Sequence, residues 1–141
     1  MAQTKATIKQ VNGITFAGIG SSNRWVMTDG PEDFGGSSGA VRPKELLLHS
    51  LGGCSGSDVV SILTKKRVKL DGFEMNISAD MTEEHPKVYT HIHIEYVFYG
   101  SDIKEKDVER AIELSLTKYC GVTAMLEKAM EISHSYRIEQ S

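Results

Sequence analysis

Two cysteines are the residues of this sequence best suited to chemistry. Cys54 lies in the segment GGCSGSD and Cys120 lies in KYCGV, 66 positions further along the chain. This separation excludes a Cys-x-x-Cys unit, so any partnership between the two must be made by the fold. A buried cysteine is usually a small inert hydrophobe, and that interpretation stays open for both. Cys120, however, stands at the predicted start of a helix, where the helix dipole favours a reactive thiolate.

A second set of side chains to consider is the pair His91 and His93. Residues two apart on a strand point to the same side of a sheet, so these imidazoles and a cysteine could supply three ligands of a zinc site. Such a pair on a polar strand face is more often simply solvated, and no cysteine lies near it in the sequence. We therefore predict no metal and no bound cofactor. The sequence also has no GxSxG, HExxH or P-loop motif, which leaves thiol chemistry as the main possibility.

Size, composition and charge limit the setting in which these cysteines work. A chain of 141 residues with 40% hydrophobic and 25% charged residues is typical of one soluble globular domain. Its net charge of −3 gives no basic face for nucleic acid or an anionic membrane. The apolar run 46–57 is too short and too rich in Gly and Ser to span a bilayer. We expect a cytoplasmic protein, and in that reducing compartment a cysteine pair indicates catalysis, sensing or metal binding more than a structural disulfide.

The secondary structure that must position the cysteines follows from the pattern of apolar residues. Alternation predicts strands, the dipeptide Asn12-Gly13 predicts a type I′ hairpin turn, and Pro43 opens a long apolar helix that carries Cys54. Three glycines around Cys54 lower helix propensity by about 1 kcal/mol each, which predicts a close approach of another helix or of substrate. We expect one α+β domain over 1–141, with strands within 3–28, a loop over 29–42, a central helix over 43–67, strands within 70–99, helices within 103–129 and a closing strand over 131–139.

The predicted central helix has a further consequence. It is apolar on most sides over 25 residues, and one sheet of a chain this short cannot cover all of them. A second copy of the chain is the simplest cover, so we expect a homodimer.

Both cysteine segments resemble those of a known family. The stretch PKELLLHSLGGC over 43–54, then DVVSIL, RAIELS and KYCGV, is similar to the OsmC/Ohr family of peroxide-removing stress proteins, and most similar to its YhfA-like branch. The resemblance implies an OsmC-like fold, in which antiparallel sheets wrap around two long central helices in an intertwined homodimer. It also implies a thiol peroxidase for organic hydroperoxides. Cys54 would attack the peroxide, Cys120 would resolve the sulfenic acid as a disulfide, and an external dithiol of the lipoyl type would reduce it.

One part of the family pattern differs in this sequence. Family members place an N-terminal arginine beside the first cysteine, oriented by a glutamate ten residues before it, where this chain has Lys44. The candidates for these roles are Arg24 and the neighbouring Glu45, although Glu45 lies on a different side of the helix and Arg24 is as readily a solvated loop residue. Lys44 could itself supply the positive charge, but a lysine at a helix start is normally solvated. A non-catalytic OsmC-fold protein that binds a small apolar or thiol-bearing ligand at the dimer interface is therefore the alternative function.

Overall fold

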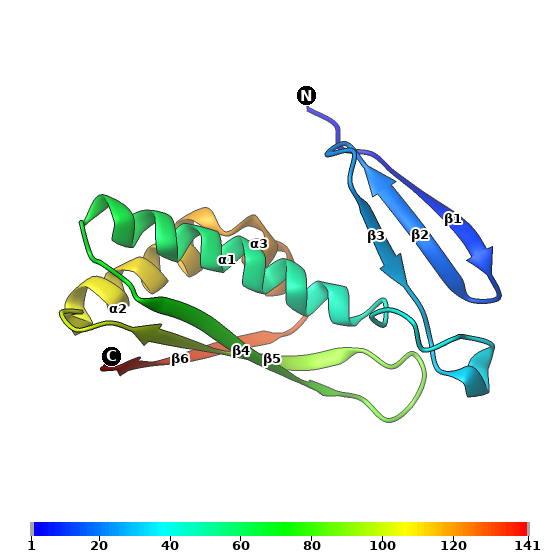
Figure 1. Ribbon diagram of the computed structural model, residues 1–141. Helices are drawn as coiled ribbons and strands as arrows, with labels where there is room; N and C mark the ends of the chain where they lie inside the picture. The colour runs from blue at the N-terminus through cyan, green and yellow to red at the C-terminus, as the bar shows by residue number, and fades with distance from the viewer. Residues whose placement is uncertain (1, 141) are drawn as a thin grey trace. The chain divides into compact units, whose positions relative to one another are not determined.

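The first of two compact units is a small antiparallel sheet. The computed structural model describes residues 2–140 and divides into units Met1–Leu47 and Leu48–Ser141. In the first unit β1 (Ala6–Asn12), β2 (Thr15–Gly20) and β3 (Trp25–Thr28) pair in that order (Figure 1). The β1–β2 turn lies one residue later than predicted, because the register shifts between Gln10 and Asn12. Gly13 then occupies the first central position with a φ of 53°, as in a type II′ turn.

The connection that follows β3 is organised by a buried carboxylate. Asp29 is 2% exposed and accepts backbone N–H groups from Gly30, Ser37 and Gly39 at 2.8 to 3.2 Å. Burial alone would raise the pKa of Asp29, but these N–H donors together hold it below its ordinary value of 3.8. The segment predicted as a loop is thus ordered, and it contains one 3-10 turn, η1 (Glu32–Phe34).

The second unit packs helices on one face of a three-stranded sheet. Its elements are α1 (Glu45–Lys65), β4 (Gly72–Met81), β5 (Tyr89–Tyr99), α2 (Glu105–Leu114), a π-helical turn η2 (Ser115–Tyr119), α3 (Gly121–Leu126) and β6 (Glu131–Glu139). The sheet order is β4-β5-β6, and α1 and the α2–α3 segment lie on the same face of it (Figure 1). The α+β class predicted from the sequence is confirmed, with two sheets and three α-helices among residues 2–140.

The prediction of purely antiparallel sheets is wrong for this second sheet. β4 and β5 are antiparallel, but β5 and β6 are parallel. The physical reason is the connection between β5 and β6, which consists of α2, η2 and α3. The helical crossover carries the chain from the end of β5 back to the edge of the sheet at which β5 began, so β6 runs in the same direction as β5.

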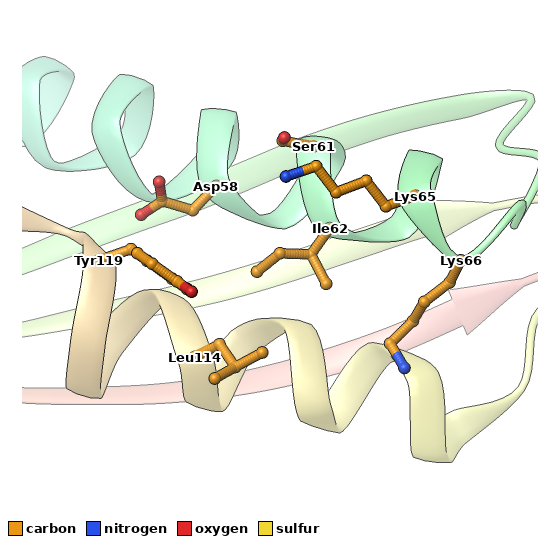
Figure 2. A pocket seen from close by; sticks show the side chains of 7 residues that line it. All are labelled: Asp58, Ser61, Ile62, Lys65, Lys66, Leu114 and Tyr119. Carbon is orange, nitrogen blue, oxygen red and sulfur yellow. The ribbon is translucent and has the colours of Figure 1, made fainter.

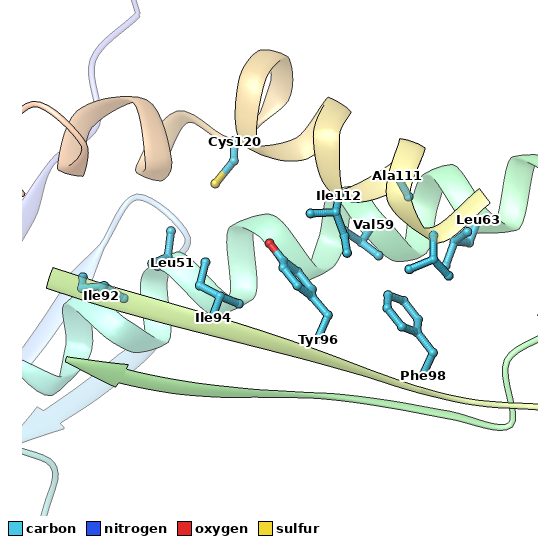
Figure 3. Packing of buried hydrophobic residues seen from close by; sticks show 11 residues of the cluster. Leu51, Val59, Leu63, Ile92, Ile94, Tyr96, Phe98, Ala111, Ile112 and Cys120 are labelled. Carbon is cyan, nitrogen blue, oxygen red and sulfur yellow. The ribbon is translucent and has the colours of Figure 1, made fainter. Parts of the chain in front are cut away.

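The core of the second unit lies between α1, β5 and α2. Alternate residues of β5, Ile92, Ile94, Tyr96 and Phe98, are fully buried and meet apolar residues of both helices. Cys120 belongs to the same cluster and lies at one end of it (Figure 3). The opposite side of β5 carries His91 and His93, which are hydrogen-bonded to Ser133 of β6 at 2.7 Å. This histidine pair therefore faces away from the cysteine that it would need as a metal ligand.

Two features fix α1 in place. At its start, the carboxylate of Glu45 accepts the backbone N–H of Arg42 at 3.1 Å, which closes a capping box around Pro43. Further along, a Cβ at Gly52 would lie 2.9 Å from Ile77, and one at Gly56 would lie 3.1 Å from Met75. Two of the three glycines around Cys54 thus allow α1 to approach β4 closely. The prediction of a close approach is confirmed, but the neighbour is a strand of the sheet and not another helix or the substrate.

α1 is also longer than the apolar run from which the absence of a membrane span was predicted. Among residues 2–140 it is the one helix whose length and composition would suffice to cross a membrane. The central helix of a water-soluble domain can have the same length and composition, and Leu51, Val59 and Leu63 of α1 are buried in the core of the second unit.

Candidate functional site

Cys54 shares one face of α1 with an acidic side chain. Asp58 follows Cys54 by four residues, so both side chains project from the same side of the helix. Both are partly buried. Between them, Ser55 and Gly56 are fully buried against the sheet. The fold of α1 alone therefore places a thiol next to a carboxylate.

Cys120 is positioned by the π-helical turn. The backbone N–H of Cys120 donates to the carbonyl of Ser115 at 2.8 Å, a bond that spans five residues. In an ordinary α-helix, side chains five residues apart would point about 140° from each other. The wider turn brings Ser115 and Cys120 to the buried side together, where they are 0% and 3% exposed. Turns of this kind are frequent at functional sites, and the apolar pattern of the sequence did not indicate one.

Cys120 is also the N-cap residue of α3. Its sulfur accepts the backbone N–H of Thr123 at 3.4 Å. A Cβ added at Gly121 would have no other atom within 4 Å, so no packing contact requires a glycine directly after the cysteine. The predicted position of Cys120 at the start of a helix is where the structure places it, although α3 is only six residues long.

Asp58, which the sequence analysis did not single out, lies close to both predicted cysteines. Their three potential ligand atoms, the two Sγ atoms and a carboxylate oxygen, all lie within 4.8 Å of one another. Both cysteines are free thiols in this structure. A disulfide requires a sulfur–sulfur distance of about 2.05 Å, so the two sulfurs would have to move closer together to form one. The fold thus brings together two sulfurs that the sequence keeps 66 positions apart.

The surroundings of Cys120 keep its proton in place. Burial is the largest effect and raises the pKa of the Cys120 thiol, and a hydrogen bond to Cys54 raises it further. The backbone N–H and the side chain of Thr123 act in the opposite direction but do not outweigh burial. Cys120 is therefore held as a thiol beside Cys54, the less buried of the two cysteines.

A buried chain of hydroxyl groups ends at Asp58. Ser115 donates to the Asp58 carboxylate at 3.0 Å, and Ser55 lies 2.8 Å from Ser115 and 2.6 Å from the hydroxyl of Tyr96. Each hydroxyl has one proton to donate. Because Ser115 gives its proton to Asp58, Ser55 donates to Ser115 and Tyr96 donates to Ser55. This chain fixes the Asp58 carboxylate, and the burial of Tyr96 raises the pKa of its phenol from 10.0 to about 12.

A pocket opens beside Asp58. It has a volume of about 390 Å³ and lies between α1 and the α2–η2 segment. Figure 2 shows Asp58 and Tyr119 at one end, Ile62 and Leu114 facing each other in the middle, and Lys66 at the other end. The pocket therefore combines an apolar middle with charged groups at its ends, and Asp58 is shared between it and the cysteine cluster.

The remaining predicted site residues are placed elsewhere. Arg24 lies in the first unit, in the connection between β2 and β3, where its exposed guanidinium donates to the backbone carbonyl of Asn23 at 3.1 Å. Glu45 takes part in the capping box of α1. The residues that sequence reasoning missed are Asp58, Ser115 and Tyr96. Only Asp58 carried a signal, its four-residue spacing from Cys54 on a predicted helix.

The long helix of this α+β fold carries one cysteine, and a helical crossover brings a second cysteine beside it. Together these features define a class of two-cysteine proteins. Residues 35–135 match the family described as OsmC-like protein. The chain is also 41% identical over 136 residues to "Protein YhfA" of Escherichia coli strain K12, which covers 95% of this chain and 97% of that protein. This protein belongs to the OsmC-like family, as the resemblance of its cysteine segments predicted.

Solved structures support the same fold. A hypothetical protein from Aquifex aeolicus is similar with a TM-score of 0.87 and 32% identity, over 100% of this chain and 99% of that one. An organic hydroperoxide resistance protein OsmC from Legionella pneumophila, described as a predicted redox protein, is similar with a TM-score of 0.70. It covers 96% of this chain and 97% of that one at 12% identity, so it shows a shared fold alone.

Proposed function

We propose that this protein is a thiol peroxidase that reduces organic hydroperoxides with Cys54 and Cys120. The observation that supports this most directly is the position of the two sulfurs, which lie within 4.8 Å of each other beside a pocket. Family membership supports it as well, since similar folds include the organic hydroperoxide resistance protein of Legionella pneumophila.

The proposed reaction has three steps. The Cys54 thiolate attacks one peroxide oxygen, the O–O bond breaks, and the alcohol leaves after it takes up a proton, so that Cys54 becomes a sulfenic acid. The Cys120 thiol then attacks the Cys54 sulfur and displaces water, which forms the disulfide. An external dithiol, for which we propose the lipoyl type, reduces the disulfide and is itself oxidised. The position of Cys120 close to Cys54 suits the resolving role, and the proton that burial holds on Cys120 leaves with the Cys54 hydroxyl as water.

The pocket supports a substrate with an apolar group. Ile62, Leu114 and the ring of Tyr119 line it near Asp58, and an alkyl or aryl hydroperoxide could bury its carbon skeleton there. Hydrogen peroxide has no such group and would gain nothing from these contacts. We therefore propose organic hydroperoxides as the preferred substrates.

For the activating cation we propose Arg24, with Lys44, which directly precedes α1, as the alternative. Asp58 adds a negative charge beside the sulfurs, which opposes formation of a second anion there. A cation would offset this, and the guanidinium of Arg24 is solvent-exposed and donates to the carbonyl of its neighbour Asn23, a contact that is easily exchanged. Glu45 already accepts the Arg42 N–H, so we give it the role of a helix cap.

We also propose that the protein acts as a cytoplasmic homodimer. Residues of α1 that point away from its own sheet are exposed, among them Leu47 and Val60 at 40% and 39%. A second copy that packs its α1 against this side would cover them. The reducing cytoplasm would supply the dithiol.

Intact-mass measurement tests the reaction. Reduced protein treated with one equivalent of cumene hydroperoxide should lose two hydrogens, and a dithiol should restore the original mass. Cys120→Ser should instead gain one oxygen as a trapped sulfenic acid, whereas Cys54→Ser should do neither and should lose turnover. Undiminished turnover in Cys54→Ser would overturn the proposal.

The same experiment separates the alternative function. When the mass change is followed over time, a reaction with cumene hydroperoxide no faster than that of free cysteine, together with a ligand that co-purifies with the native protein, would support a binding site and not a peroxidase. The observation that favours this alternative is the Asp58 carboxylate beside the thiols.

A further inference from the structure

The cluster of Cys54, Asp58 and Cys120 has the composition of a metal site. It offers two sulfurs and one carboxylate oxygen, all within 4.8 Å of one another. We propose that the reduced protein binds a thiophilic divalent cation, of which Zn²⁺ fits best, through these three side chains. This inference uses the same cysteines as the proposed peroxidase reaction but does not depend on that reaction.

The three ligand atoms lie only slightly further apart than the ligands of a tetrahedral zinc site do. Zinc bonds of about 2.3 Å to sulfur in a tetrahedral site place two sulfur ligands about 3.8 Å apart. Cys54 and Asp58 already share a helix face, and Cys120 faces them from the start of α3. Because the ligand atoms already lie within 4.8 Å of one another, zinc binding requires them to approach by at most about 1 Å.

The donor types select the metal. Two thiolates favour zinc and related soft ions over Mg²⁺ or Ca²⁺, which prefer oxygen ligands alone. Loss of both thiol protons beside Asp58 would place three negative charges at a partly buried position, and a bound divalent cation would offset their repulsion. A three-residue ligand set leaves a fourth tetrahedral position for water or a small molecule, as zinc sites with an open position do. Because Asp58 also lines the pocket, that position would open toward the pocket.

The ligand atoms are themselves held by hydrogen-bond donors, as ligands at metal sites usually are. Ser115 donates to Asp58 Oδ2 at 3.0 Å, and Ser115 is in turn fixed by Ser55. The N–H of Thr123 donates to Cys120 Sγ at 3.4 Å. Both donors would keep the ligand oriented when the ion binds.

The side chain of Thr123 is a separate observation that points to a bound ion. It is 2% exposed, and within the described part of the chain its hydroxyl makes no hydrogen bond of normal geometry, although it lies near enough to the Cys120 sulfur to lower the pKa of that thiol. A metal-bound thiolate is a much stronger hydrogen-bond acceptor than a thiol, so metal binding at Cys120 would give this buried hydroxyl a partner.

Cobalt provides a direct test. Reduced full-length protein titrated with Co²⁺ should develop sulfur-to-cobalt charge-transfer absorption, saturating at one ion per chain, and Zn²⁺ should displace it. Cys54→Ser and Cys120→Ser should each lose about half of that absorption or all binding. Asp58→Asn keeps both thiols and should weaken Zn²⁺ binding at least tenfold, because loss of even a group that only hydrogen-bonds to a ligand costs about 10 to 100-fold in affinity.

Asp102→Asn is the matched control, since it makes the same change at an exposed position in the β5–α2 connection and should bind Zn²⁺ like the wild type. Absence of charge-transfer absorption in the wild type, or equal Zn²⁺ affinity in Asp58→Asn and Asp102→Asn, would overturn the inference. A protein that forms the disulfide without binding Co²⁺ would overturn only this inference, and one that binds Co²⁺ but ignores hydroperoxide would overturn only the proposed function.

Discussion

In β5 every second side chain from Ile92 to Phe98 is fully buried, whereas in β1 all seven residues are exposed. Both strands carry apolar residues at alternate positions, so the difference does not come from their sequence patterns alone. β5 lies under α1 and α2, which fill one face of its sheet. The sheet of the first unit has large apolar side chains exposed, including Ile8 at 62% and Trp25 at 58%.

This comparison shows that the two units bury their apolar side chains to different extents. The unit Leu48–Ser141 contains a core of its own, and the candidate site lies at one end of that core. The unit Met1–Leu47 displays apolar surface that a single chain leaves in water, which is a usual mark of an interaction surface. A second copy of the chain is the cover that we propose.

The largest effect on stability is expected when an isoleucine is shortened to alanine, and the same substitution can be compared in the two units. Ile94→Ala in β5 should lower the free energy of unfolding by about 2 to 5 kcal/mol, because it leaves a cavity in the core. Ile8→Ala in β1 makes the same change at an exposed position and should cost about 1 kcal/mol or less at low protein concentration. Urea denaturation followed by helical circular dichroism measures both.

Protein concentration is the control for this comparison. A larger cost of Ile8→Ala that grows with protein concentration would assign the β1 surface to a dimer. A cost equal to that of Ile94→Ala and independent of concentration would contradict the comparison itself.

The second prediction concerns the buried hydroxyl chain, which is found in the second unit. Burial raises the pKa of Tyr96 to about 12 in the folded protein, against 10.0 for an ordinary tyrosine. The unfolded state therefore releases the proton first as the pH rises, and folding stability falls between pH 10 and about 12 by up to about 3 kcal/mol. Tyr96→Phe should remove this part of the alkaline loss.

Unfolding free energies of wild type and Tyr96→Phe, measured across that pH range, test the prediction. Tyr119→Phe is the matched control, because it removes the same hydroxyl group from a tyrosine that is 54% exposed. A wild-type slope identical to that of Tyr96→Phe would show that the Tyr96 phenol is not protected by the fold.

These contrasts also show what the sequence could and could not predict. The core face of β5 follows from strict alternation, and the helix that carries Cys54 follows from Pro43 and the apolar residues after it. The meeting of Cys54 with Cys120 could not follow from spacing, because it depends on a crossover and on the π-helical turn at Ser115. An apolar pattern with helical period does not reveal where one residue is inserted into a helix.

The polar side chains around the cysteines could not be predicted from the sequence for a different reason. Ser55, Tyr96 and Ser115 are ordinary residues of two helical segments and a strand, and only their convergence in space makes them a network. The parallel pairing of β6 with β5 was missed because the family resemblance suggested antiparallel sheets, although the helical connection before β6 favours a parallel strand.

A third prediction separates the pocket from the cysteines. Leu114→Asn places a polar group in the apolar middle of the pocket and should lower kcat/KM for cumene hydroperoxide about tenfold, the usual effect of a lost apolar contact. Turnover of hydrogen peroxide should change little, since it has no carbon skeleton to bury. Val88→Asn, at an exposed position in the β4–β5 connection, should alter neither rate. Equal losses for both peroxides would mean that Leu114 supports the fold and not the substrate.

The smallest effect is expected in the first unit at acid pH, where Asp29 organises the connection after β3. The N–H groups of Gly30, Ser37 and Gly39 hold the pKa of Asp29 below 3.8, so the stability it contributes is present above that pH and is lost as the pH falls through the lowered value. Trp25 is the only tryptophan of the sequence and lies in this unit, so its fluorescence reports the first unit, whereas circular dichroism reports mainly the helices.

On acidification the Trp25 signal should change before the helical signal, and Asp29→Asn should produce that change already at neutral pH. Asp33→Asn, an exposed neighbour in the same connection, should behave like the wild type. Simultaneous loss of both signals in wild type would show that the two units unfold together, and the contrast between them would then hold for burial but not for stability.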